Sequence, residues 1–229
     1  MLPERLQRLY GPSYFIQRYP SAQAREVMYR LERARLYEFK RGGRILDIGC
    51  GLGGFLDCLD DRWEKHGIEP SDFAAAASRQ KGINVQKWNT DWPLTWGDEC
   101  FDAIVLRGTL QHLDRPMFIL WQAHRMLKPG GLLAVTATPN TGSLCFRLFQ
   151  QIPALDPARN FWLVSDGELV NALKNCGFET TQLVYPYWGT PYAHPLRDCL
   201  RFIAALLGFY RPFAWPGNQM ECWAVKNGA

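Results

Sequence analysis

The sequence predicts an α/β fold in which a mostly parallel sheet carries helices on both faces. Short apolar runs, typical of buried parallel strands, alternate along the chain with segments of helical apolar spacing. The run at residues 45–48 stops at a cluster of glycines, after which an apolar helical pattern begins. A strand that passes through a glycine turn into a helix is typical of a ligand-binding sheet edge, because glycine lets a ligand approach the backbone.

The composition is that of a globular protein. Of 229 residues, 47% are hydrophobic and 21% are charged, and the length suits one α/β domain. No apolar run reaches 18 residues and no signal peptide is recognisable, which predicts a soluble cytoplasmic protein without a transmembrane segment. The seven cysteines include no C-x-x-C pair and no close Cys/His cluster, so we expect neither structural zinc nor disulfides.

The glycine turn allows two interpretations. Gly49, Gly51 and Gly54 match the dinucleotide pattern G-x-G-x-x-G, and Glu69 lies where an acid that binds ribose is expected. Taken alone, this spacing predicts NAD. Asp47, however, stands two residues before the first glycine and faces the mouth of the turn, where a carboxylate favours a cationic or amino-bearing ligand. An ordinary strand, turn and helix without a ligand is the third possibility.

The stretch 44–56 closely resembles motif I of class I S-adenosylmethionine (SAM) dependent methyltransferases. The join Leu-Lys-Pro-Gly-Gly at residues 127–131 is also similar to this family and is rare in NAD-binding domains. The resemblance covers residues 44–187. It implies SAM as the cofactor and a Rossmann-like, seven-stranded sheet whose last strand, near residues 220–226, runs antiparallel beside the fifth.

The resemblance also implies roles for individual residues in binding the cofactor. Asp47 and the amides of the glycine turn would hold the methionine moiety, and Glu69 would accept hydrogen bonds from both ribose hydroxyls. The adenine would lie at Asp91 and Trp92, although Asn89 is an alternative there. The expected cofactor-binding set is Asp47, Gly49, Cys50, Gly51, Glu69, Pro70, Asp91, Trp92 and Arg107.

The segment after the expected fourth strand, residues 101–106, supplies one candidate catalytic residue. Residues 107–116 resemble the family's signature after this strand, with Gln111 where glutamate is common. That departure removes one carboxylate and makes proton transfer by an acid at this position doubtful. His112 is the candidate general base, because neutral imidazole accepts a proton near pH 7. Its ring could instead hydrogen-bond a loop carbonyl and shape the turn.

The two ends of the chain are the least regular parts. We expect residues 1–43 to form an N-terminal helical cover, irregular over 1–20 and helical over 22–40, with Val27, Leu31 and Ala34 on the apolar face. The ten basic and four acidic residues before position 45 could attract an anion or a membrane surface, or form a solvated helix face.

The cofactor-binding core, residues 44–187, is followed by an aromatic C-terminal segment over 188–229. Within the core, the irregular stretch 139–164 is expected to be a lid insertion, and Ser165 with Glu168 forms a capping box for the next helix. The C-terminal segment contains an apolar helix near 196–207 and the last strand. Its aromatic surface could form a substrate pocket, a dimer contact or core packing.

Together these features predict a methyltransferase that acts on a small molecule, with oxygen as the expected acceptor atom. The alternatives are an RNA or protein methyltransferase and an NAD-dependent oxidoreductase. Leu106-Arg107-Gly108-Thr109 replaces the Asn/Asp-Pro-Pro-aromatic motif of amino-methylating enzymes, and no appended nucleic-acid module is visible, so we do not expect a nucleic-acid partner. The sequence does not specify the oligomeric state.

Overall fold

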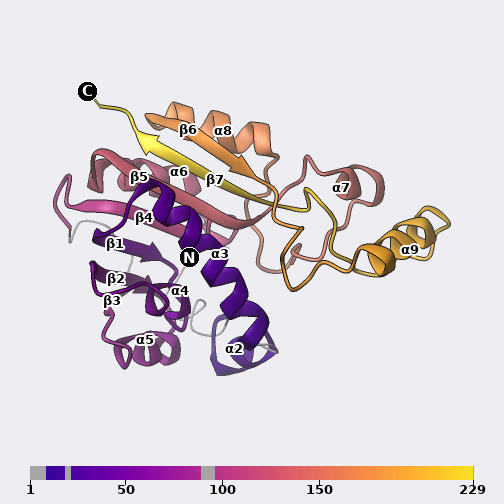
Figure 1. Ribbon diagram of the computed structural model, residues 1–229, viewed down its shortest axis with the longest axis horizontal. Helices are drawn as coiled ribbons and strands as arrows, with labels where there is room; N and C mark the ends of the chain where they lie inside the picture. Colours follow the sequence, from indigo (N-terminus) through magenta and orange to yellow (C-terminus); the bar gives the residue numbers. More distant parts are fainter. Residues whose placement is uncertain (1–8, 19–21, 89–95, 229) are drawn as a thin grey trace.

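The computed structural model describes residues 9–18, 22–88 and 96–228, which build a seven-stranded sheet of order β3-β2-β1-β4-β5-β7-β6 (Figure 1). Strands β1 to β5 pair in parallel, whereas β7 runs antiparallel to both β5 and β6, which confirms the predicted fold class. The strands are β1 (Gly43–Ile48), β2 (Trp63–Glu69), β3 (Asn84–Lys87), β4 (Phe101–Arg107), β5 (Leu127–Pro139), β6 (Phe178–Val184) and β7 (Gln219–Lys226).

Helices cover both faces of the sheet, as the alternation of side chains along β1 requires. Leu46 and Ile48 join the core beneath α6 (Pro116–Met126) and α8 (Asp166–Asn175). Ile45 joins the opposite core, beneath α3 (Ala22–Phe39), α4 (Gly54–Asp57) and α5 (Asp72–Arg79). The helical pattern after the glycine turn forms a single turn of helix, α4.

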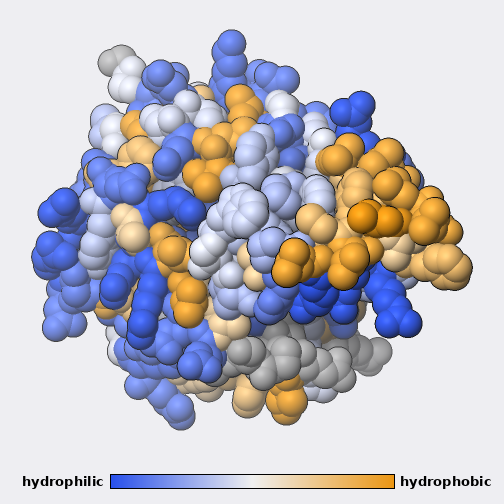
Figure 2. Space-filling model, turned by 45° about the vertical axis from the view of Figure 1, so that its right-hand side comes forward, coloured by the Kyte–Doolittle hydropathy of each residue, from blue (hydrophilic) through white to orange (hydrophobic). Residues whose placement is uncertain are grey.

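Two further helices, α7 (Leu144–Phe149) and α9 (Pro195–Leu206), lie beyond the end of the sheet, at the right of Figure 1. Figure 2 shows hydrophobic side chains gathered on the same side of the molecule. A small aromatic cluster joins the two helices, with Phe149 against Phe202 at 5.6 Å between ring centroids. The stretch 139–164 was expected to be irregular, but it contains α7. The side chain of Ser143 caps the N-terminus of this helix.

The N-terminal segment differs from the prediction in two ways. Residues Pro12–Arg18 form a helix, α2, where an irregular lead was expected. Helix α3 buries Met28, Glu32 and Leu36 rather than the stripe that begins at Val27. The buried face includes a glutamate, so a count of apolar residues alone selects the wrong face. Ser21, which precedes this helix in the sequence and is of a residue type suited to an N-cap, lies outside the described residues.

Strand β5 is 13 residues long and contains two irregularities. Phe101 pairs with Leu127 and Ala103 with Leu132, so the Leu-Lys-Pro-Gly-Gly stretch forms a bulge inside the strand instead of separating it from α6. A second register shift lies between Val135 and Thr138. Ala137, between them, has a φ of 51°, a left-handed conformation that is unusual for a residue other than glycine.

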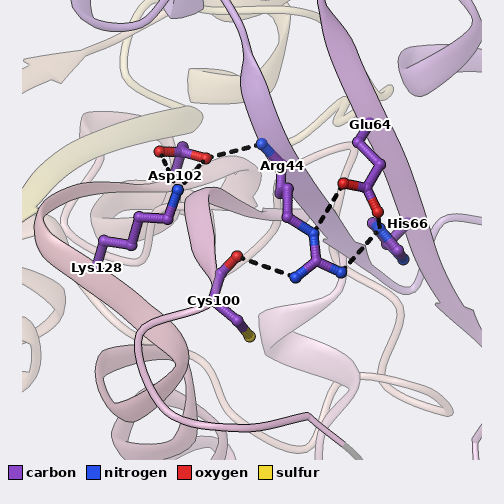
Figure 3. A network of polar contacts seen from close by, with 6 residues as sticks. All are labelled: Arg44, Glu64, His66, Cys100, Asp102 and Lys128. Atoms are coloured by element: carbon purple, nitrogen blue, oxygen red, sulfur yellow. Dashed lines mark hydrogen bonds and ion pairs between the residues drawn. The ribbon is translucent and has the colours of Figure 1, made fainter.

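A network of paired charges holds the amino ends of the strands together (Figure 3). The Arg44 amide donates to Asp102 at 2.8 Å, and Lys128 contacts both carboxylate oxygens of Asp102 at 2.8 and 2.9 Å. The Arg44 side chain forms an ion pair with Glu64 at 3.0 Å, and Glu64 contacts the ring of His66 at 2.7 Å. This edge of the sheet thus carries acids and bases that neutralise one another.

Candidate active site

The glycine turn after β1 lies at the opposite, carboxyl edge of the sheet. Gly49 has a φ of 81°, and a Cβ there would lie 2.4 Å from the Thr109 hydroxyl, so only glycine fits. The amides of Gly49 and Cys50 both donate to the carbonyl of Ile68, at 2.8 and 3.1 Å. These amides therefore tie the turn to β2, and a cofactor would meet a bare backbone at Gly49 rather than free donors.

Glu69, the last residue of β2, is only 4% exposed. One carboxylate oxygen accepts from the Gly51 amide at 2.8 Å, and the other accepts from the Ser71 amide at 2.9 Å. Burial raises the pKa of Glu69 to about 7, although these two amides oppose the rise. Each oxygen retains acceptor capacity, because a carboxylate oxygen has two lone pairs, so the side chain can still bind a pair of hydroxyls.

Asp47 lies in β1 between Gly67 of β2 and Val105 of β4, and it is 2% exposed. Its Oδ1 atom is buried and has no hydrogen-bond partner among the described residues. Burial raises the pKa of Asp47 to about 7, although the nearby positive charge of Arg107 opposes the rise. A buried carboxylate oxygen without a donor is costly, and a ligand that supplies a donor would remove that cost.

Arg107, at the end of β4, connects this edge to helix α3. Its Nε donates to the buried carboxylate of Glu32 at 2.6 Å, and its guanidinium lies over the ring of Tyr29, 4.6 Å from the centroid. The second oxygen of Glu32 is buried without a hydrogen bond in the part of the chain that the structure describes. The pair fixes α3 across the carboxyl edge and places one cation beside two buried acids.

A cleft opens above these residues and holds about 960 Å³ of space, part of it open to solvent. Asp47, Cys50 and Gly51 do not line it; Cys50 and Asp47 are buried. The N-terminal segment, expected to form a cover, supplies several of its lining side chains. The lining includes Tyr10, Tyr14, Phe15, Arg25, Gly49, Glu69, Pro70, Arg107, His112 and Ala137.

His112 lies in a single 3₁₀ turn, η1 (Leu110–His112), and lines the cleft. Its Nδ1 lies 2.8 Å from the carbonyl oxygen of Arg159. Because a carbonyl can only accept, we assign the proton to Nδ1, which leaves the lone pair on Nε2. The ring thus makes the loop contact considered from the sequence, and its Nε2 lies 3.5 Å from the side-chain amide nitrogen of Gln111, which can donate to it. Asp91 and Trp92, the expected adenine contacts, lie outside the described residues, as does Asn89.

A second, larger cleft of about 1570 Å³ adjoins the first and shares Arg25, Arg107 and Ala137 with it. Pro153 and Ala154, in the stretch expected to be a lid insertion, line this cleft, and the C-terminal segment contributes most of the remaining wall. Four arginines and one histidine line this cleft, and no aspartate or glutamate does so among the described residues. Those basic residues are Arg25, Arg107, His194, Arg197 and Arg201.

Two features were not predicted from the sequence: the Glu32–Arg107 ion pair, and the left-handed backbone of Ala137, which lines both clefts. Glu32 lies four residues after Met28 and four before Leu36, so a glutamate on the buried face of the helix was the available signal. Nothing in the sequence around Ala137 signals its unusual backbone. The bulge there points the residue at both clefts, and such irregularities often reshape strands beside active sites.

The comparison with known families identifies the chain. Residues 19–183 match the family model of a methyltransferase domain, which covers more than half of the sequence. The chain belongs to this family. Malonyl-[acyl-carrier protein] O-methyltransferase from Paenibacillus sp. (strain JDR-2) is 29% identical over 80% of this chain and 70% of its own length. Trans-aconitate 2-methyltransferase from Rhodopseudomonas palustris (strain BisA53) is 28% identical over 76% of this chain and 71% of its own length.

Solved structures support the same fold. A SAM-dependent methyltransferase from Thermotoga maritima superimposes with a TM-score of 0.66 over 93% of this chain and 97% of its own, at 24% identity. The chain is thus a class I SAM-dependent methyltransferase with SAM as its cofactor, which replaces the NAD interpretation of the glycine pattern. Among the described residues, no helix is long and apolar enough to cross a bilayer.

The residues at the carboxyl edge fit this cofactor. A sulfonium cofactor with an amino-acid tail brings positive charge and hydrogen-bond donors. The site offers two buried carboxylates and one orphaned buried oxygen, on Asp47. Gly49 lines the cleft as bare backbone, packed on its other side against Thr109. The observed chemistry therefore matches the cofactor that the family uses.

Proposed function

We propose that this methyltransferase transfers the methyl group of SAM to an oxygen atom of a small acidic molecule. The observation that carries the proposal is the second cleft, which adjoins the cofactor cleft and is lined by four arginines but by no aspartate or glutamate among the described residues. Two of these arginines pair with acids behind the wall, Arg107 with Glu32 and Arg197 with Asp198. Arginine binds carboxylates well because its planar guanidinium donates two parallel hydrogen bonds. A carboxylate would therefore be both attracted and oriented there.

We assign the cofactor cleft residue by residue. Asp47 would accept a hydrogen bond from the α-ammonium group, and Glu69, beside Pro70, would accept hydrogen bonds from the ribose hydroxyls. Gly49, Cys50 and Gly51 would form the turn against which the methionine moiety packs, with Arg107 beside it. Asp91 and Trp92 remain the proposed adenine contacts. When bound, SAM supplies an electrophilic methyl group on a good leaving group.

The remaining work of the protein is alignment and exclusion of water, which in favourable cases is worth roughly 7–11 kcal/mol of the activation barrier. A carboxylate acceptor is already deprotonated near pH 7, so it needs no general base. His112 would then orient its loop through Arg159. For an acceptor with a hydroxyl group, the lone pair on Nε2 could instead remove the proton. A pH profile of kcat therefore distinguishes these two roles of His112.

Two of the relatives carry names that agree with this proposal, since malonyl and aconitate groups are carboxylic acids. Their names do not fix the acceptor here, because the identities are only 29% and 28%. A tRNA methyltransferase also appears among the relatives, at 28% identity over 36% of its own length. RNA therefore belongs in any test of the acceptor.

The direct test is a screen with SAM labelled in the methyl group. The acceptors are small mono- and dicarboxylic acids, each paired with its own amide, and a preparation of tRNA. We expect label in the acids alone, released as methanol by mild base because the product is an ester. Label in the amides or in tRNA would contradict the proposal.

Arg201 provides a matched variant for the same assay. Arg201→Gln should raise KM for the acid roughly tenfold, about 1.4 kcal/mol, because a charge-assisted contact is lost. Its affinity for S-adenosylhomocysteine should not change, since Arg201 does not line the cofactor cleft. Arg41→Gln, which alters an exposed arginine at the end of α3, is the control. Equal KM values in both variants would rule out Arg201 as an acceptor contact.

A further inference from the structure

Helix α9 exposes an apolar stripe in the part of the chain that the structure describes. Leu196, Leu200, Ile203 and Leu207 follow one another at intervals of four, three and four residues, which places them on one face of the helix. Leu196 is 85% exposed and Leu200 is 69% exposed. Figure 2 shows this surface as the largest hydrophobic area in view.

The opposite face of α9 already has its own packing partners. Asp198 and Ala205 are buried, and the ring of Phe202 stacks on Trp215 with 4.5 Å between centroids. The side chains of the exposed stripe therefore take no part in the core of the protein. A helix that is apolar on both sides is normally covered on both sides, so the uncovered stripe indicates a contact surface.

The exposed apolar surface extends beyond the helix to the segments around it. Phe209, just after α9, is 74% exposed. Trp188, in the segment before α9, is 73% exposed. Leu144 and Leu148 of the neighbouring α7 are about half exposed. Each such side chain stabilises a complex by roughly 1.5–3 kcal/mol when it is fully removed from water. Burial of even part of this surface would support stable binding.

The charge around the stripe is positive. Residues 141–163 and 185–217 contain five arginines and two aspartates. Both aspartates pair with arginines, Asp156 with Arg159 at 2.6 Å and Asp198 with Arg197 at 3.2 Å. Within these two segments no further acid accompanies the other three arginines, which are Arg147, Arg201 and Arg211.

We propose that α9 docks this protein on an anionic lipid bilayer. The stripe would enter the boundary between headgroups and acyl chains, and Arg147 and Arg211, which do not line the acceptor cleft, would contact lipid phosphates. Leucine, tryptophan and phenylalanine beside arginine are typical of helices that lie in the plane of a membrane surface. Each basic residue near an anionic surface adds about 1 kcal/mol to binding. With 12 residues, α9 can lie on a bilayer but not span one.

A second copy of the chain fits the same surface less well. A symmetric contact through α9 would bring the arginines of both copies together, and the surface offers no unpaired acid to neutralise them. An anionic bilayer supplies the missing negative charge. The larger cleft is partly lined by Arg197 and Arg201 of α9, so docking would also place its mouth at the lipid surface.

Flotation of the full chain with vesicles tests the proposal. We expect binding to vesicles of phosphatidylglycerol and phosphatidylcholine, and weak or no binding to phosphatidylcholine alone. At about 0.5 M NaCl, where the Debye length is only a few Å, binding should weaken severalfold. The double variant L196E/L200E should bind at least roughly tenfold more weakly, because two charges would have to enter the apolar boundary.

The matched control is F118E/W121E, which changes two exposed apolar residues of α6. It should float like the wild type, and both double variants should keep wild-type affinity for S-adenosylhomocysteine, which shows that they fold. Three results would overturn the proposal: no flotation of the wild type, equal flotation of both double variants, or a wild-type dimer that L196E/L200E dissociates without any vesicle binding. None of these outcomes bears on the acceptor proposed above.

Discussion

The two edges of the sheet place acidic side chains in opposite environments. At the amino edge, Asp102 receives the Lys128 ammonium and the Arg44 amide, and these contacts hold its pKa below the usual value despite partial burial. At the carboxyl edge, burial raises the pKa values of Asp47 and Glu69 to about 7. The same residue type is thus stabilised as an anion at one edge and destabilised as an anion at the other.

This difference separates structural acids from functional ones. A paired carboxylate contributes to stability and needs nothing more. A buried carboxylate whose pKa is raised costs folding free energy at neutral pH, since one pKa unit corresponds to about 1.4 kcal/mol. Such destabilising carboxylates cluster at functional sites, where the charge serves to bind a ligand. The contrast predicts different responses to the same substitution at the two edges.

The largest expected effect is the loss of cofactor binding from the carboxyl edge. Asp47→Ala or Glu69→Ala should weaken S-adenosylhomocysteine binding at least roughly tenfold, or 1.4 kcal/mol, because a charge-assisted contact disappears. Calorimetric titration of the purified variants measures the effect. Unchanged affinity in either variant would remove that residue from the proposed site.

Asp47→Asn separates loss of binding from loss of folding. The Asp47 pKa is raised in the folded protein, so the ionised wild type is penalised as the pH rises from about 4 to above 7. The asparagine variant carries no such penalty, and its Tm at pH 8 should equal or exceed that of the wild type. A variant that binds weakly and melts early would instead show that Asp47 supports the fold.

The next effect is a dependence of cofactor affinity on pH. Only the ionised form of Asp47 attracts an ammonium group, so affinity should rise as the pH increases through about 7. Between pH 5.5 and 7, where an α-amino group stays largely protonated, we expect a change on the order of tenfold. Calorimetry in buffers of different ionisation enthalpy should detect proton release on binding near pH 6.5. A flat profile, or one that Asp47→Asn leaves unaltered, would contradict the assignment.

Much of the sheet and of its carboxyl edge could be predicted from the sequence because local patterns determine them. The glycine turn at Gly49 and the acid that ends β2, Glu69, are signals within about 20 residues. The structure brings both to one cleft. The antiparallel β7 followed from the family resemblance and is confirmed.

The parts that were missed depend on contacts between distant segments. The Glu32–Arg107 pair joins residues 75 positions apart, and only folding reveals that Glu32 faces the site. The second cleft combines the stretch 139–164 with the C-terminal segment, and no local pattern shows that these two segments meet. The sequence indicated an apolar helix at α9, but periodicity could not show that Leu196 and Leu200 would stay exposed.

The smallest expected effect completes the comparison from the amino edge. Asp102→Asn should lower the free energy of unfolding by about 0.5–1 kcal/mol, because it removes a partly exposed ion pair but leaves an oxygen to accept from Arg44. The depressed pKa means that Asp102 stabilises the fold above pH 4, and that this stability is lost as the pH falls through its folded pKa. The difference between variant and wild type in urea unfolding should therefore shrink at low pH and at high salt. Cofactor affinity should stay at the wild-type value, since the site lies at the other edge. Weaker S-adenosylhomocysteine binding in this variant would mean that charge at the amino edge also tunes the site, and that the two edges are not independent.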